Sequence, residues 1–196
     1  FGIKHLDGIK HIDGVEVVSL IGRELSKTKE VANQYGIAHV TTDLNESLAI
    51  KEVDAVILCT PTQMHAAQSI ACLQAGKHVQ VEIPLCDVYK DGAEVVALQQ
   101  QTGLVAMCGH TRRFNPSHQY VHQQIQAGQF NVFQMDVQTY FFRRTNMNAK
   151  GEARSWTDHL LWHHACHTID LFQYQCGEEV SEVHAVQGRL DQQLPQ

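Results

Sequence analysis

The chain has 196 residues, of which 43% are hydrophobic and 18% charged, and its formal net charge is -6 at pH 7. The charges form no long acidic or basic run, which argues against a nucleic-acid groove and a polybasic membrane patch, and no segment resembles a membrane span or a signal peptide. We therefore expect a cytoplasmic protein with one large domain, or one domain and part of a second, that binds neither nucleic acid nor membranes.

Short apolar segments alternate with helical patterns along residues 1–109. Strands are expected at residues 15–22, 37–40, 53–60, 77–82 and 104–109, and helices at residues 3–12, 24–34, 44–50, 65–75 and in the stretch that ends near residue 102. This alternation is typical of a parallel sheet that helices cover on both faces. We predict an α/β fold with a Rossmann-type doubly wound parallel sheet, which makes residues 1–109 a dinucleotide-binding domain.

The chain begins at Phe1-Gly2 and runs directly into a helix, whereas a doubly wound domain normally opens with a strand and a glycine-rich turn. If Gly2 is the last glycine of a GxGxxG fingerprint, Phe1 and Gly2 lie at the phosphate-binding turn. An ordinary glycine at a helix start would give the same pattern. We expect that the first strand of the domain is missing before Phe1 and that further residues follow Gln196.

The pattern changes in the second half of the chain. Helices are expected at residues 115–128 and 155–177, and longer, more alternating strands at residues 131–142 and 180–188. We predict a second α/β domain over residues 110–196.

In a doubly wound sheet the ligand lies beyond the carboxyl ends of the strands, so residues that follow a strand are cofactor candidates. Arg23 follows the first predicted strand, at the position where an acid would hold the ribose hydroxyls of NAD. An arginine there can pair with a 2'-phosphate, which favours NADP and leaves NAD possible, and the nearby Lys27 and Lys29 add positive potential. A surface arginine at a helix start is the alternative interpretation.

Two further strand ends carry polar side chains. Thr60 and Pro61 end one predicted strand, with His65 on the next helical turn, and Glu82 ends another. A carboxylate at such a place can hold a ribose hydroxyl or a helix N-terminus. We predict that Thr60, Pro61, His65 and Glu82 bind the cofactor, although a plain turn with a helix-start histidine fits the first of these strand ends equally well.

The segment WHHACHTID (162–170) places His163, His167 and Asp170 on one face of the predicted helix, opposite the face that carries its apolar side chains. A zinc site, a proton-transfer site and a solvated histidine-rich face are all compatible with it. We expect no metal, because the HExxH pattern is absent and no clear third ligand accompanies the two histidines. Paired histidines in one cleft push their proton affinities apart and suit proton removal during hydride transfer.

The cysteines are scattered along the chain and include no CxxC pair. They are Cys59, Cys72, Cys86, Cys108, Cys166 and Cys176. This distribution predicts reduced, mostly buried thiols in a cytoplasmic protein, not a disulfide framework.

Three motifs, taken in this order, resemble the Gfo/Idh/MocA family of nicotinamide-dependent oxidoreductases over essentially the whole chain. They are CTP (59–61) with His65, EIP (82–84) in the place of Glu-Lys-Pro, and HTID (167–170) in the place of His-x-x-Asp. The resemblance implies a Rossmann domain followed by an α/β domain with an open, mostly antiparallel sheet, which would serve substrate binding and oligomerisation. It also implies a nicotinamide cofactor and a homo-oligomer, either a dimer or a tetramer.

Two positions depart from the family pattern. Ile83 stands where the family often has a lysine that contacts the reacting carbinol, and His163 stands where an aspartate is common. The catalytic acid-base role would then pass to His163 and His167, with Asp170 setting the orientation of His167.

The segments WHHACHTIDLF and HTRRFNPSH are similar to a family member that acts in ring-cleavage catabolism of protocatechuate. That similarity implies NADP-linked oxidation of a cyclic hemiacetal to a dicarboxylate lactone. Carboxylates pair well with guanidinium groups, so the candidate substrate-binding residues are Arg112, Arg113, Arg143 and Arg144, unless these are solvated loop arginines. A sugar or inositol dehydrogenase, a non-catalytic dinucleotide sensor and a metal-dependent enzyme are the alternatives.

Overall fold

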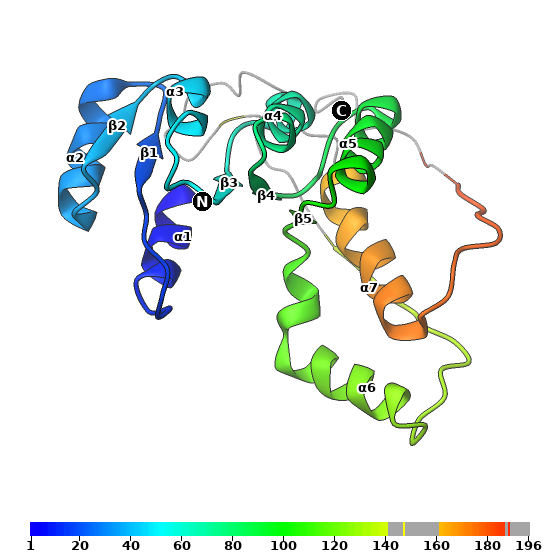
Figure 1. Cartoon of the computed structure of the whole chain (residues 1–196). Coiled ribbons are helices and arrows are strands. Elements are labelled where there is room, and N and C mark those ends of the chain that lie inside the picture. The colour runs from blue at the N-terminus through cyan, green and yellow to red at the C-terminus, as the bar shows by residue number, and fades with distance from the viewer. Residues whose placement is uncertain (141–146, 148–160, 187, 189–196) are drawn as a thin grey trace. The chain divides into compact units, whose positions relative to one another are not determined.

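The computed structural model describes residues 1–140, 147, 161–186 and 188. The chain forms two compact units, unit 1 (Phe1–Gly109) and unit 2 (His110–Gln196). Unit 1 alternates helices and strands, whereas the regular elements described in unit 2 are helices (Figure 1).

Every strand pair of unit 1 is parallel. Its helices are α1 (Gly2–Ile9), α2 (Leu25–Tyr35), α3 (Leu44–Leu48), α4 (Thr62–Gln74) and α5 (Tyr89–Thr102), and its strands are β1 (Ser19–Ile21), β2 (His39–Thr41), β3 (Ala55–Leu58), β4 (His78–Val81) and β5 (Ala106–Cys108). Gly36 and Gly103 end α2 and α5 with φ of 71° and 67°, a left-handed conformation that glycine adopts readily. The predicted Rossmann-type α/β alternation is therefore confirmed in this unit.

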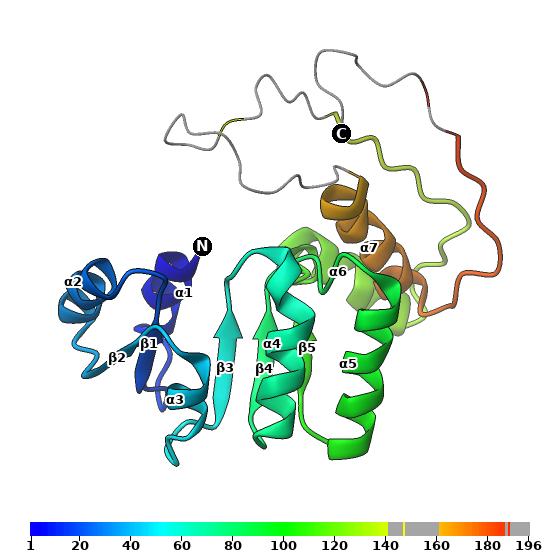
Figure 2. The ribbon, with the colours of Figure 1, turned by 90° about the horizontal axis from the view of Figure 1, so that it is seen from above.

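The five strands form two hydrogen-bonded groups, β1–β2 and β3–β4–β5 (Figure 2). Ser19 pairs with His39 in the first group, and Val79 of β4 pairs with Val56 and Ala106 in the second. In the doubly wound order 3-2-1-4-5-6, β2 and β1 match positions 3 and 2, and β3, β4 and β5 match positions 4, 5 and 6. No strand among the residues that the structure describes occupies position 1.

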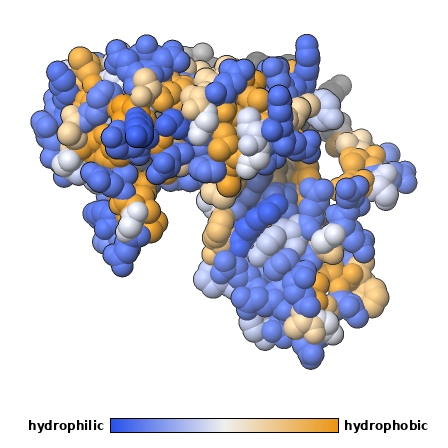
Figure 3. All heavy atoms as spheres, viewed as in Figure 1, coloured by the Kyte–Doolittle hydropathy of each residue, from blue (hydrophilic) through white to orange (hydrophobic). Residues whose placement is uncertain are grey.

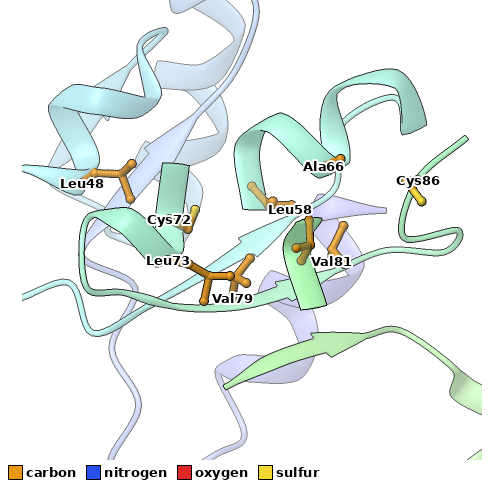
Figure 4. Packing of buried hydrophobic residues seen from close by; sticks show 9 residues of the cluster. Leu48, Leu58, Ala66, Cys72, Leu73, Val79, Val81 and Cys86 are labelled. Carbon is orange, nitrogen blue, oxygen red and sulfur yellow. The ribbon is translucent and has the colours of Figure 1, made fainter. Parts of the chain in front are cut away.

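Each strand group has its own apolar core. The larger cluster consists of Leu48, Leu58, Ala66, Cys72, Leu73, Val79, Val81, Cys86 and Val95 (Figure 4). The smaller cluster, Leu6, Ala32 and Ile37, packs with partly buried residues of β1 and β2. Burial of apolar side chains is the main source of stability, so each cluster stabilises the strand group against which it packs.

Helices α4 and α5 pack against one face of the β3–β4–β5 group. Alternate residues of β3 and β5 are open to solvent, with Ile57 37% exposed and Met107 42% exposed. The buried residues of β3 and β4 belong to the cluster that α4 and α5 share. The side chains of a strand point alternately to the two faces, so helices on one face leave the other residues exposed.

Unit 2 begins with a short 3-10 helix, η1 (Thr111–Phe114), followed by α6 (Pro116–Gln126). The Asn115 side chain caps α6 by accepting a hydrogen bond from the Ser117 backbone N–H at 3.0 Å, and Pro116 occupies the first helical turn, as predicted. The helix predicted at residues 155–177 is described from Leu161 onwards. In the described residues it consists of a π-helical turn, η2 (Leu161–Ala165), which continues as α7 (Cys166–Cys176) to Gly177.

The predicted strands of the second domain are not formed in the described residues. Residues 131–140 and 180–186 are extended or irregular, and Phe133 is 97% and Tyr140 89% exposed. Figure 3 shows apolar residues lying at the surface among polar ones. An alternating pattern makes a strand only when a neighbouring strand takes up its backbone hydrogen bonds, and the described part of unit 2 supplies none.

All six cysteines are free thiols, as predicted, but the expectation that most of them are buried is wrong, because three are only partly buried and Cys176 is exposed. Cys72 and Cys86 are buried, and burial raises the pKa of Cys72 to about 11, so this thiol stays protonated and unreactive. Among the residues described, no helix has the length and apolar character that crossing a membrane requires.

Candidate active site

His65 connects the ends of two strands in unit 1. Its ring is 1% exposed, and its two nitrogens lie 2.7 Å from the Thr60 carbonyl oxygen and 2.8 Å from the Pro84 carbonyl oxygen. A ring N–H donates to a carbonyl oxygen, so the tautomer of the ring decides which of the two carbonyls accepts. The buried His65 can therefore fix the backbone around Thr60 and Pro61, while its own nitrogens are already occupied.

Glu82 follows β4 and is in contact with α1. Its Oε1 lies 2.6 Å from Nε2 of His5, and Cys59 offers a third donor atom within 4.8 Å of the other two. Burial, together with the negative charge of Glu82, raises the pKa of the Cys59 thiol at this place. His5 was absent from the predicted site, and no local sequence signal connects it to a residue 77 positions away.

The turn between β1 and α2 is tightly packed at the predicted cofactor residue Arg23. A Cβ atom at Gly22 would collide with the Thr28 side chain, which lies in the first turns of α2 and donates a hydrogen bond to the Glu24 carbonyl. Only glycine therefore lets α2 approach the end of β1 so closely. Arg23 is exposed at this turn, and Lys27 pairs with Glu24 at 2.5 Å, which offsets part of the predicted positive potential.

Asp170 forms the centre of the polar site in unit 2. It is 8% exposed and accepts two hydrogen bonds from Arg113, from Nε at 2.8 Å and from Nη2 at 2.5 Å. These bonds raise the pKa of the Arg113 guanidinium, which also lies 5.2 Å from the centre of the Tyr174 ring. The sequence predicted that Asp170 lies on an ionisable face of its helix, opposite the apolar face. In the structure Asp170 is buried, as is its neighbour Leu171.

His110 lies between Asp170 and His167. Its Nε2 is 3.9 Å from Asp170 Oδ1, and its ring meets the His167 ring edge to face with centroids 6.0 Å apart. Burial is the main reason that the pKa values of both histidines are lowered, so both rings favour the neutral form. His110 was not among the predicted site residues, although it begins the segment HTRRFNPSH that follows β5.

Arg112 also belongs to this group. Its Nη1 donates to Thr168 Oγ1 at 3.0 Å, and its charge contributes to the lowered pKa of His167. The described contacts thus bring together His167, Asp170, Arg112, Arg113 and His110. Asp170 was predicted to orient His167. In the structure Asp170 pairs with Arg113, and the ring that meets His167 is that of His110.

The other predicted residues of the second half of the chain are His163, Arg143 and Arg144. His163 lies in the π-helical turn, where its carbonyl oxygen accepts a hydrogen bond from the Cys166 thiol at 3.2 Å. Arg143 and Arg144 lie outside the described residues. Among the described residues, two groups of side chains have donor atoms close enough to bind a metal ion. They are His5 with Cys59 and Glu82 in unit 1, and His110 with Cys166 and His167 in unit 2.

Two family models match the chain. Residues 1–110 match the model described as "Oxidoreductase family, NAD-binding Rossmann fold" of Gfo/Idh/MocA proteins, and residues 116–195 match "Bacterial oxidoreductases, C-terminal". Together they account for both units.

Curated relatives are similar along most of the chain. The 4-carboxy-2-hydroxymuconate-6-semialdehyde dehydrogenase of Sphingobium sp. (strain NBRC 103272 / SYK-6) is 66% identical over 194 residues, which are 99% of this chain and 61% of that protein. Inositol 2-dehydrogenase of Mycolicibacterium smegmatis is 28% identical over 160 residues, 81% of this chain and 45% of that protein. The chain thus spans about three-fifths or less of the length of these relatives.

Solved structures share the fold. A probable dehydrogenase from Thermotoga maritima has a TM-score of 0.75 at 22% identity and matches 91% of this chain and 53% of that chain. The WlbA dehydrogenase of Chromobacterium violaceum, solved with NADH and UDP-GlcNAcA, has a TM-score of 0.59 at 28% identity, over 64% of this chain and 36% of that chain. The 3-ketoreductase KijD10 of Actinomadura kijaniata, solved with NADP, has a TM-score of 0.56 at 26% identity, over 63% of this chain and 39% of that chain.

Proposed function

Because this chain belongs to the Gfo/Idh/MocA family of oxidoreductases, we propose that its protein is an NADP-dependent dehydrogenase of 4-carboxy-2-hydroxymuconate-6-semialdehyde. The cyclic hemiacetal of this semialdehyde would be oxidised to 2-pyrone-4,6-dicarboxylate, a step of protocatechuate catabolism. The observation that carries the proposal is the 66% identity, over 99% of the chain, to a dehydrogenase of this name. Free thiols and the family resemblance support the further expectation of a cytoplasmic homo-oligomer.

His167 is the proposed general base. Its Nδ1 is buried and has no hydrogen-bond partner in the described part of the chain, so Nε2 is the nitrogen proposed to take the hemiacetal hydroxyl proton. Bound nicotinamide supplies the hydride acceptor. Loss of the hydroxyl proton and of the carbon-bound hydride turns the hemiacetal directly into an ester, so the step needs no covalent thiol intermediate. His163 remains the alternative base.

The polar neighbours of His167 give it a defined environment. Asp170 would keep Arg113 and His110 in position, which makes it a positioning residue for the His167 side of the site. Arg112 is partly buried and bonds to the neutral Thr168 hydroxyl, and its charge lies beside His167. Since Arg113 is already paired with Asp170, Arg112 is the better candidate of the two arginines to bind a substrate carboxylate. Arg143 and Arg144 remain predicted substrate contacts.

The strand ends of unit 1 are proposed to hold the cofactor. The close approach that Gly22 permits, with Arg23 exposed next to it, fits a dinucleotide whose 2'-phosphate pairs with the guanidinium. Thr60, Pro61 and Glu82 would line the remaining strand ends, and Phe1 and Gly2 would contribute the first turn of α1. Relatives of similar identity were solved with NADH and with NADP, which keeps NAD as the alternative.

The full-length protein, supplied with freshly ring-cleaved semialdehyde and either NADP or NAD, tests the proposal. We expect formation of reduced nicotinamide, with a preference for NADP, and the pyrone dicarboxylate as the product identified by mass spectrometry. Turnover of inositols without turnover of the semialdehyde would favour an inositol dehydrogenase. Cofactor binding without turnover of either substrate would favour a dinucleotide sensor.

A further inference from the structure

Three side chains of unit 2 bring potential metal-donor atoms close together. His110 precedes η1, Cys166 and His167 open α7, and one donor atom from each lies within 4.8 Å of the others. Imidazole nitrogen and thiolate sulfur are the donors that zinc prefers, and a tetrahedral zinc ion brings such ligands to roughly 3.5 Å from one another. Small side-chain rotations would therefore bring the three donors to bonding distance.

Each of the two histidines has a buried ring nitrogen that a metal ion could bind. The Nδ1 atoms of His110 and His167 are buried, and neither has a hydrogen-bond partner among the described residues. A buried polar atom without a partner is costly, and a metal ion would satisfy a ring nitrogen. On the other side of its ring, His110 directs Nε2 towards Asp170 at 3.9 Å, which resembles the carboxylate that commonly orients a metal-ligating histidine.

The charged side chains around the three donors do not by themselves attract a cation. Asp170 is paired with Arg113, and the Arg112 charge close to His167 leaves a net positive charge. The Cys166 thiol must lose its proton to solvent when the metal binds, and this proton release supplies the negative charge of the site. The site should therefore select a thiophilic cation such as Zn²⁺ or Co²⁺ over a hard cation such as Mg²⁺, which requires oxygen ligands.

We propose that His110, Cys166 and His167 bind a thiophilic divalent cation, and that the bound cation reversibly inhibits the enzyme. The inhibitory part rests on the proposed function. An imidazole that coordinates a metal through one nitrogen keeps its proton on the other, so metal-bound His167 has no lone pair left to accept a substrate proton. Three protein ligands leave a fourth position for water.

Metal binding is tested first without substrate or cofactor, on the metal-stripped full-length protein. Equilibrium dialysis with Zn²⁺ should give saturable binding, and Co²⁺ should produce the charge-transfer absorption of a thiolate ligand. Cys166→Ser and His110→Asn should each weaken binding by at least about tenfold, since even the loss of an outer-shell partner costs 10- to 100-fold. Cys176→Ser is the matched control, because it removes an exposed thiol from the other end of the same helix.

A second readout tests the role of His167 directly. Bound Zn²⁺ should protect His167 from modification by diethyl pyrocarbonate, detected by peptide mass spectrometry, and the protection should be lost in Cys166→Ser. In turnover assays Zn²⁺ should inhibit the unmodified enzyme, chelation should restore it, and Cys166→Ser should resist inhibition. Absence of the thiolate band, or equal loss of binding in Cys176→Ser, would overturn the site. Zinc-loaded protein with undiminished turnover would overturn the inhibition, whereas protein that binds zinc but never oxidises the semialdehyde would contradict only the proposed function.

Discussion

Arg113 and Asp170 form a two-point ion pair that joins η1 to α7. Arg113 Nε and Nη2 lie 2.8 Å and 2.5 Å from the two carboxylate oxygens, and the Asp170 side chain is almost fully buried. Because Asp170 also faces His110, this pair connects the segment that follows β5 to the helix that carries His167. The geometry of the candidate site therefore depends on a contact between residues 57 positions apart.

The ion pair should contribute to the stability of unit 2. Replacing Arg113 with Ala leaves the Asp170 carboxylate buried without its partner, and we expect a loss of about 1 to 3 kcal/mol, below the range for fully buried pairs because Arg113 is partly exposed. Arg113→Lys keeps the charge but not the two-point geometry and should recover part of the loss. Urea unfolding of the full-length variants measures it, and an unchanged midpoint in Arg113→Ala would contradict the assigned role.

His167 should matter for the chemical step. If it is the general base, His167→Ala should lower kcat by about 10²- to 10⁴-fold while the unfolding midpoint stays close to that of the parent protein. His163→Ala is the matched comparison, with an expected smaller effect. Steady-state kinetics of both variants with the semialdehyde decide between the two histidines, and near-normal turnover of His167→Ala would rule that residue out.

Gly22 should tolerate no side chain. Gly22→Ala would push α2 away from the end of β1, at a cost of about 1 to 3 kcal/mol typical of overpacking. Gly8→Ala is the control, because a Cβ atom there meets nothing within 4 Å inside α1 and should stabilise the helix by about 0.5 to 1 kcal/mol. Thermal unfolding compares the two, and equal melting temperatures would argue against the tight turn.

Arg23 should set the preference between the two cofactors. Arg23→Ala should raise the KM for NADP by about 10- to 100-fold, the equivalent of losing a hydrogen-bonded charge contact, and should leave the KM for NAD nearly unchanged. Lys29→Ala, which removes a neighbouring charge from α2, serves as the control. A parallel rise in both KM values would mean that Arg23 supports the turn and does not contact the 2'-phosphate.

The stability of unit 2 should fall in weak acid. The pKa values of His110 and His167 are lowered from 6.5 in the folded protein, chiefly by burial. The unfolded chain therefore binds more protons in weak acid, so this contribution is fully present above pH 6.5 and is lost as the pH falls towards the folded pKa values. The urea midpoint of the parent protein should decline as the pH is lowered through this window. The decline should be less steep in His167→Gln. Equal slopes in the two proteins would contradict the prediction.

Sequence patterns predicted the local structure of unit 1 well and that of unit 2 only in part. The alternation of apolar strands and helices, the Asn115-Pro116 helix start and the glycine helix ends follow from interactions between close neighbours. The strands expected at residues 131–142 and 180–188 were wrong where the structure describes them, because a strand depends on a distant partner that its own pattern does not contain.

The sequence by itself determined the Rossmann-type fold, the family and the histidine-rich segment that opens α7, because each of these is written in short motifs and local periodicity. Only the tertiary structure decided that Asp170 pairs with Arg113, that His110 stands against His167, and that His5 reaches Glu82. Such contacts form when segments far apart in the chain pack together. No local sequence pattern encodes which polar side chains will be buried next to one another.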